Sequence, residues 1–119
     1  DFTREAAGEA SLIVNLTIDT WFGDSTAPWL HLFMHASRAA ELGIPMVRGS
    51  LSGVSAFIDA TGQITALLPL DVQGLLVEDV ELRDVTTPYR VMGPVFPWLV
   101  TLLAAGSLGL ALARRRRLD

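Results

Sequence analysis

The reactive side chains that lie closest together in this sequence are two histidines. His31 and His35 are the only histidines of the chain, and residues four apart lie on the same side of a helix. Such a pair can bind a metal ion, but the residues between them include no glutamate of the kind that metalloproteases use as a base. The spacing is poor support for a metal site, so the sequence predicts neither a metal ion nor a cofactor.

A second segment, Gly49 to Gly53, is similar in outline to the turn that exposes a catalytic serine. Its central residue is Leu51, however, and no helix is predicted to follow it. The chain also contains no cysteine and no lysine, so neither a thiolate nucleophile nor a disulfide can come from these residues. No catalytic residue is therefore predicted within the chain itself.

The charge is divided between a basic end and an acidic remainder. The formal net charge is -4, yet four of the nine basic residues form the run Arg114 to Arg117. The rest of the chain has no basic stripe interleaved with aromatic residues, which is the pattern typical of nucleic-acid binding. We therefore expect no nucleic-acid partner.

The first 90 residues have the mixed composition of a soluble layered domain. Pro28 to Leu42 is predicted to be an amphipathic helix, capped by Ser25 or Thr26 and stopped by Gly43. A helix end is predicted at Phe2 to Glu9, and strands at Ser11 to Leu16, Met46 to Gly49, Val54 to Asp59, Gln63 to Leu68 and Leu75 to Leu82. This order indicates the α/β class, but with too few helices to cover both faces of a sheet. We therefore expect the chain to be part of a longer protein.

The last part of the chain has the composition of a membrane span. Val91 to Ala113 carries no charge and as a helix would be roughly 34 Å long, against a hydrocarbon core of about 30 Å. The basic residues of 114–119 follow directly, so the positive-inside rule places this tail in the cytoplasm and residues 1–90 on the other side. An alternative interpretation of the tail is a C-terminal sorting signal, although no processing motif precedes it.

The loop after the first predicted strand carries a resemblance to a known family. Asn15 to Ser25 reads N-L-T-I-D-T-W-F-G-D-S, and it is followed by Pro28-Trp29 and His31. This resembles the N-L-(S/T)-N-D-x-W-F-G-x-S segment of apolipoprotein N-acyltransferases. Further matches to the same family, some of them shared with the wider nitrilase superfamily, occur in the same order at Arg38 to Pro45, at Arg48 to Gly62 and at Thr87-Pro88-Tyr89.

The resemblance implies a fold and an activity. Residues 1–90 would be the C-terminal portion of an α-β-β-α nitrilase-like (carbon-nitrogen hydrolase) domain, 91–113 one transmembrane helix, and 114–119 a cytoplasmic tail. Family enzymes carry an acyl chain from a phospholipid, through a cysteine thioester, to the α-amine of a diacylglyceryl-cysteine lipoprotein, using a Glu, Lys and Cys set. That set precedes the segment seen here, so this chain is predicted to be inactive alone.

The same resemblance implies a location and leaves two alternatives. The protein would lie in a bacterial inner membrane, with its nitrilase-like part in the periplasm and its C-terminus in the cytoplasm. Its partners would be the phospholipid donor, the lipoprotein acceptor and the bilayer, while the oligomeric state is left open. The alternatives are a membrane-anchored carbon-nitrogen hydrolase of the amidase or nitrilase type, and an inactive membrane-tethered remnant.

Three residues of the loop are the predicted substrate-binding residues. Trp21 and Phe22 match the family's aromatic pair beside the nucleophile, where an acyl chain needs apolar surface; simple packing at a strand end is the alternative. Asp19 matches the family's aspartate, and fixing the loop through backbone hydrogen bonds is preferred to proton transfer. The chain departs from the family at Ile18 and Leu51, where asparagine is typical, and at Pro94, where aspartate is common.

Overall fold

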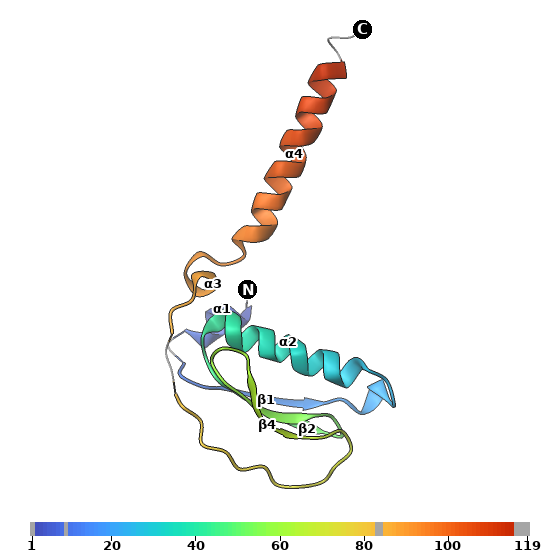
Figure 1. Cartoon of the computed structure of the whole chain (residues 1–119), viewed down its shortest axis with the longest axis vertical. Helices are drawn as coiled ribbons and strands as arrows, with labels where there is room; N and C mark the ends of the chain where they lie inside the picture. The colour runs from blue at the N-terminus through green and yellow to red at the C-terminus, as the bar shows by residue number, and fades with distance from the viewer. Residues whose placement is uncertain (1, 9, 83–84, 116–119) are drawn as a thin grey trace.

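A four-stranded sheet with one helix on its face forms the body of the protein, and a second long helix extends away from it (Figure 1). The structure, a computed structural model, describes residues 2–8, 10–82 and 85–115, with side chains described within these ranges from residue 3 to residue 110. In chain order the elements are α1 (Phe2–Ala7), β1 (Ile13–Ile18), the 3-10 turn η1 (Thr20–Phe22), α2 (Ala27–Leu42), β2 (Met46–Leu51), β3 (Ser55–Ile58), β4 (Ile64–Leu68), α3 (Pro88–Met92) and α4 (Val95–Arg115). The predicted α/β class is confirmed.

The strand order β1-β2-β3-β4 combines one parallel pair with two antiparallel pairs. In the parallel pair, Asn15 lies beside Arg48 and Ile18 lies beside Leu51. Both strands therefore end at the same edge of the sheet, and the loops that follow them meet there. The two-sheet arrangement of an α-β-β-α sandwich stays a prediction, because the structure describes one sheet.

The core lies between α2 and the sheet. Leu32 and Ala39 are fully buried in the middle of α2, as the helical spacing of its apolar residues predicts. They pack with the buried residues Ala36, Met46, Val54, Ala56 and Ile58, and with partly buried Ile13, Ile64, Leu67 and Leu70. Because side chains alternate along a strand, Val14, Leu16 and Ile18 point to the opposite face of the sheet, where all three are exposed.

The end of α2 agrees closely with the sequence. Gly43 adopts a left-handed conformation, with φ +67°, and its N–H donates to the Ala39 carbonyl. A side chain at Gly43 would also collide with the Val85 carbonyl, so two constraints require glycine here. At the start of the helix Thr26 is the capping residue, although its side chain makes no capping hydrogen bond.

The strand predicted at Leu75 to Leu82 is wrong. This segment forms no strand, and its apolar side chains Leu75, Val77 and Leu82 are exposed. It runs as an irregular connection between β4 and α3, below the sheet in Figure 1. The physical reason is that β-propensity is realised only where a neighbouring strand offers hydrogen bonds, and none does so here among the described residues.

The apolar end of the chain is divided differently from the predicted 91–113 stretch. Val91 and Met92 belong to α3, and α4 begins at Val95 after Gly93, which has φ +69°, and Pro94, which has no N–H to donate. Within the described residues, no helix has both the length and the apolar character that a membrane crossing needs. The membrane span at 91–113 therefore stays a prediction. Residues 116–119 of the predicted basic tail lie outside the described residues.

Shortening a core side chain of α2 tests this packing. Leu32→Ala removes a fully buried side chain, so we expect the free energy of unfolding of the complete protein to fall by about 2–5 kcal/mol. Leu51→Ala, at a position that is 67% exposed, is the matched control and should cost less than about 1 kcal/mol. Chemical denaturation followed by circular dichroism gives both values, and equal losses would contradict the assignment of this core.

Candidate functional site

The candidate site lies where the two parallel strands end. The loop after β1 begins at Asp19, whose N–H donates to the Leu51 carbonyl over 3.4 Å. The hydroxyls of Thr20 and Ser52 are 3.0 Å apart across the two loops. Because ligands of open α/β sheets bind beyond the carboxyl ends of the parallel strands, this edge is where a site is expected.

A buried ion pair joins the two strand ends. Arg48 Nη2 donates to Asp19 Oδ2 over 2.6 Å, and neither side chain has any exposed surface. The Asp19 carboxylate also accepts hydrogen bonds from Ser50 Oγ at 3.2 Å and from Thr17 Oγ1 at 3.3 Å. The donors to this carboxylate are thus side chains, whereas the sequence predicts backbone amides.

The guanidinium of Arg48 is satisfied from several directions. Its Nε donates to the Val54 carbonyl at 3.1 Å, and Nη1 donates to Asn15 Oδ1 at 3.3 Å. Burying an ion pair costs several kcal/mol per ion, and only such additional hydrogen bonds offset that cost. The arginine therefore fixes β1, β2 and the start of β3 relative to one another.

The two histidines of α2 lie over this ion pair. His31 Nδ1 donates to Asp19 Oδ1 over 2.9 Å, so it does not accept from Arg48 Nη2, which lies 3.2 Å away. His35 Nδ1 is 2.8 Å from Arg48 Nη1 and 2.7 Å from the His31 carbonyl. In the neutral ring this nitrogen accepts from the arginine in one tautomer and donates to the carbonyl in the other.

The electrostatics of the cluster favour a charged aspartate and a neutral His35. Burial opposes ionisation of Asp19, but the His31 hydrogen bond and the charge of Arg48 outweigh it and lower the pKa of this carboxyl. Burial, and after it the nearby positive charge of Arg48, lower the pKa of His35 despite its hydrogen bond to the His31 carbonyl. The helical spacing thus places His31 against the Asp19 carboxylate and His35 against the guanidinium of Arg48. No group of three or more potential ligands within the described residues could hold a metal ion.

Gly53 provides the space that the Asp19 carboxylate occupies. A Cβ atom at this position would collide with Asp19 Oδ2 and with Ser50 Oγ. Gly53 and the Asp19 side chain are both buried, so the carboxylate cannot move into solvent to avoid it. The segment Gly49 to Gly53 thus packs closely against the buried Asp19 carboxylate. It is not a nucleophile elbow, because β3 follows it and not a helix.

Trp21 and Phe22 project from the loop that this ion pair holds. Trp21 is 71% exposed, and its ring meets that of Phe22 edge-on at a centroid distance of 5.8 Å. Phe22 is half-buried and meets the His31 ring edge-on at 6.0 Å. The three predicted site residues are therefore close together in space, with the aspartate buried and the tryptophan facing outward. An exposed, braced aromatic pair can provide apolar surface to a ligand.

Arg38 and Glu41 form the predicted ion pair on α2. Arg38 Nη1 donates to Glu41 Oε2 over 2.9 Å and also to the Tyr89 hydroxyl over 3.0 Å. The Tyr89 hydrogen bond, and then the charge of Glu41, raise the pKa of Arg38 against its partial burial. The pair thus braces α2 against α3, where the Thr87 hydroxyl also donates to the Glu41 carbonyl.

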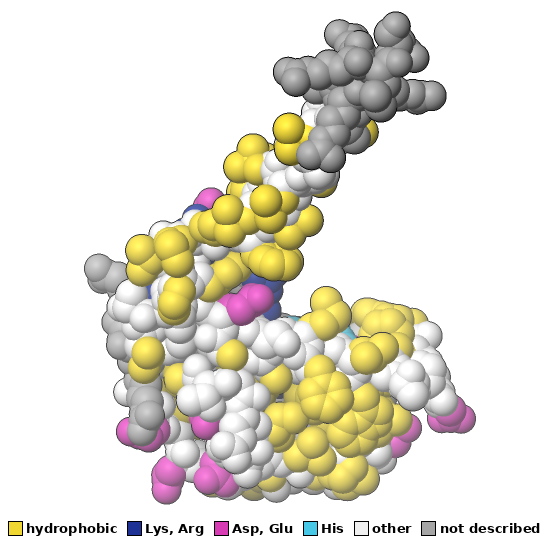
Figure 2. Space-filling view, turned by 45° about the horizontal axis from the view of Figure 1, so that its top comes forward, with side chains coloured by type: hydrophobic (Ala, Val, Ile, Leu, Met, Phe, Trp, Pro, Cys, Tyr) yellow, Lys and Arg dark blue, Asp and Glu magenta, His cyan; other side chains and the backbone are white. Residues whose placement is uncertain are grey.

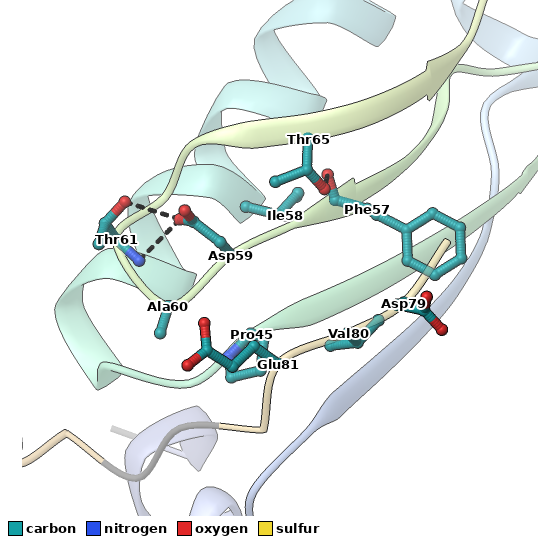
Figure 3. A pocket seen from close by; sticks show the side chains of 10 residues that line it. All are labelled: Pro45, Phe57, Ile58, Asp59, Ala60, Thr61, Thr65, Asp79, Val80 and Glu81. Carbon is teal, nitrogen blue, oxygen red and sulfur yellow. Dashed lines mark hydrogen bonds between the residues drawn. The ribbon is translucent and has the colours of Figure 1, made fainter. Parts of the chain in front are cut away.

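Several hollows adjoin the body of the domain. One, of about 510 Å³, lies between β1 and α2 and is bordered by Asn15, His31 and His35. Another, of about 250 Å³, lies on the far side of the sheet, beside Asp59, Asp79 and Glu81 (Figure 3). Asp59 Oδ1 accepts from the N–H and the hydroxyl of Thr61 at 2.8 and 2.7 Å, so its role is to close the β3–β4 turn. The first hollow thus borders side chains that contact the ion pair, and a smaller one of about 90 Å³, lined by Asp19, Thr20 and Ser52, borders the carboxylate itself.

Arg48 and His31 are the members of this cluster that sequence reasoning did not assign to a site. A signal was present, because Arg48 stands among apolar residues in a predicted strand, where a charge needs a buried partner. His31 follows the aromatic loop closely in the sequence, where it belongs to the family resemblance and to a histidine pair with poor support for metal binding. Neither signal identifies which acidic group is the partner.

Removal of the Asp19 charge tests the ion pair. Asp19→Asn leaves Arg48 buried without a counter-charge, so we expect the free energy of unfolding to fall by about 3–5 kcal/mol at neutral pH. Asp24→Asn, in the exposed part of the same loop, is the control and should change it by less than about 0.5 kcal/mol. Denaturant midpoints of the complete protein measure both, and a neutral Asp19→Asn would rule out a stabilising pair.

The same pair predicts a dependence on acid. Because the pKa of Asp19 is lowered in the folded state, its contribution to stability is present above the ordinary aspartate pKa of about 3.9. The contribution should be lost as the pH falls from that value through the lowered folded-state pKa. Denaturation curves recorded at decreasing pH should therefore fall more steeply for the unmodified protein than for Asp19→Asn, and parallel curves would contradict the assignment.

Comparison with known proteins identifies the family. Residues 2–89 match the Carbon-nitrogen hydrolase family. Apolipoprotein N-acyltransferases are similar over nearly the whole chain: that of Pasteurella multocida is 37% identical over 92% of this chain and 21% of its own length. Those of Brucella melitensis and Bradyrhizobium diazoefficiens are each 41% identical, over 95% and 98% of this chain and 21% of their own lengths. The chain spans about a fifth of the length of these curated relatives, and it belongs to the carbon-nitrogen hydrolase family.

Proposed function

We propose that this chain forms the C-terminal part of an apolipoprotein N-acyltransferase. The observation that carries the proposal is the extent of the similarity. The family match ends at residue 89, but the match to the Bradyrhizobium diazoefficiens acyltransferase covers 98% of this chain and so includes most of the apolar residues that follow. A hydrolase domain alone does not account for that similarity.

The proposed reaction transfers an acyl chain in two steps. A cysteine thiolate attacks the ester carbonyl of a phospholipid, forms a thioester and releases the lysophospholipid. The free amine of a diacylglyceryl-cysteine lipoprotein then attacks the thioester, forms an amide and returns the thiolate. A glutamate handles the protons and a lysine stabilises the oxyanion. These three groups lie outside this chain, which contains no cysteine and no lysine.

The loop at the end of β1 is the proposed contribution of this chain to the site. Trp21 and Phe22 supply the apolar wall against which the acyl chain lies, and the buried Asp19 holds the loop through Arg48. An acyl chain gains free energy in proportion to the apolar surface removed from water, and an indole supplies a large rigid surface. The proposed role of Asp19 is thus positioning, since its carboxylate is buried.

The proposed location is a bacterial inner membrane. The support is the uncharged sequence from Val91 to Ala113, followed by the basic run that favours the cytoplasmic side. The side chains of α4 described as far as residue 110 are exposed apart from Val95, which is half-buried, and most of them are apolar. A helix without a buried face needs an apolar environment along its whole circumference.

A second candidate function is hydrolysis of a carbon-nitrogen bond, which the family match over residues 2–89 favours. In that case water replaces the lipoprotein amine as the acceptor. A third candidate, an inactive tethered remnant, is motivated by Ile18 and Leu51, which replace two typical asparagines at the site. Ser52, beside them, has a positive φ of 62°, a conformation that asparagine adopts more readily than serine.

The reaction of the complete protein distinguishes these functions. Purified in detergent and given phospholipid and a diacylglyceryl-cysteine peptide, it should yield the N-acylated peptide, detected by mass spectrometry. Release of ammonia from amides or nitriles without peptide acylation would establish the hydrolase instead. Absence of both reactions would favour the remnant.

Substitution of the aromatic loop tests the proposed wall. Trp21→Ala should raise the KM for phospholipid by about tenfold or more, the equivalent of 1.4 kcal/mol of lost contact, with a smaller change in kcat. Trp21→Phe keeps an aromatic ring and should stay within about threefold of the unmodified enzyme. Thr65→Ala, on the exposed side of β4 at the opposite edge of the sheet from β1, is the control. An unchanged KM for Trp21→Ala would show that the indole does not contact the acyl chain.

A further inference from the structure

The outward side of α2 is unusually apolar for a helix on a protein surface. Its first eleven residues, Ala27 to Ser37, include no Asp, Glu, Lys or Arg. Leu30 and Met34 lie opposite the buried Leu32 on the helix and are 61% and 66% exposed. A helix that is apolar on all sides is normally covered on all sides. Together with the exposed Trp29 and Phe33, these residues form what we call the α2 surface.

The position of the α2 surface points to what covers it. In Figure 1, α2 lies between the sheet and the side toward which α4 extends. Figure 2, which turns that side toward the viewer, shows hydrophobic side chains along α4 and again beside the histidines on the body. An apolar environment that surrounds α4 would therefore have its boundary close to the α2 surface.

Arginines gather on the α2 side, at the base of α4. Arg4 and Arg38 contact α3, which itself carries Arg90: Arg4 donates to the Arg90 carbonyl, and Arg38 donates to Tyr89 and pairs with Glu41. The acidic residues Asp59, Asp79 and Glu81 adjoin the hollow beside Phe57, on the sheet face opposite α2. An anionic surface would thus meet arginines beside α2 and would be repelled from the far side of the sheet.

We propose that the α2 surface rests on the headgroup and upper acyl region of the bilayer, so that the domain lies with α2 against the membrane. This inference rests on the proposed membrane location of α4. Aromatic and long apolar side chains above a basic margin are what a surface-lying helix needs to enter the boundary of a bilayer to a depth of about 5–10 Å. A functional consequence follows, because the Trp21 loop directly precedes α2 and is held at the lipid boundary, where an acyl chain can reach it.

Site-specific labelling with quenching lipids tests the placement. The chain has no cysteine, so Leu30→Cys and Thr65→Cys each introduce one labelling site into the complete protein, and the unmodified protein gives the background of any other cysteines. Leu103→Cys reports on α4 independently. Each protein is labelled with an environment-sensitive fluorophore and reconstituted into vesicles of phosphatidylethanolamine and phosphatidylglycerol, with or without nitroxide-bearing lipid.

We expect nitroxide lipid to remove about half of the fluorescence at positions 30 and 103 and little at position 65, which faces away from the membrane. Quenching at position 103 alone would overturn the placement of α2 and leave the membrane location of α4 standing. Quenching at none of the positions would overturn both. A label at position 30 that is shielded from water but unaffected by nitroxide lipid would show that protein covers the α2 surface, which also overturns the proposal.

Discussion

A single buried ion pair, between Asp19 and Arg48, is the interaction on which the rest of this structure depends. Removing two charges from water is costly, and their mutual attraction repays that cost only when each also has further hydrogen bonds. Here β1 supplies Asn15, β2 supplies Ser50 and α2 supplies His31, so three elements must be in place before the pair is satisfied. The ion pair therefore restricts how β1, β2 and α2 can pack, because only one arrangement of these elements satisfies its hydrogen bonds.

The ion pair also connects the fold to the candidate site. The aspartate that it holds is the first residue of the loop that presents Trp21, and the loop carries its own edge-on contacts to Phe22 and His31. A large aromatic side chain that is mostly exposed gains little from packing, so its orientation has to be fixed by the backbone below it. A buried carboxylate bonded on several sides provides that rigidity without occupying the surface where a ligand would lie.

The body of the protein has two unlike sides. One face of the sheet is covered by α2, whose outward residues are apolar, and the other adjoins an irregular segment that carries acidic groups. Neither side resembles the mixed polar surface of an independent soluble domain. The exposed Val14, Leu16 and Ile18 of β1 add a row of apolar side chains on the face opposite α2. This row on β1 agrees with a chain that spans about a fifth of its relatives.

The sequence by itself determined the local features: the α/β class, the stop of α2 at Gly43, the Arg38–Glu41 pair and the motif around Trp21. Each depends on residues within a few positions of one another, where periodicity, glycine geometry and helical spacing are decisive. Only the tertiary structure decided that Leu75 to Leu82 is no strand and that Asp19 bonds to Arg48, 29 residues away. Strand pairing and buried charge pairs depend on partners distant in the chain, and no local pattern specifies which partner is met.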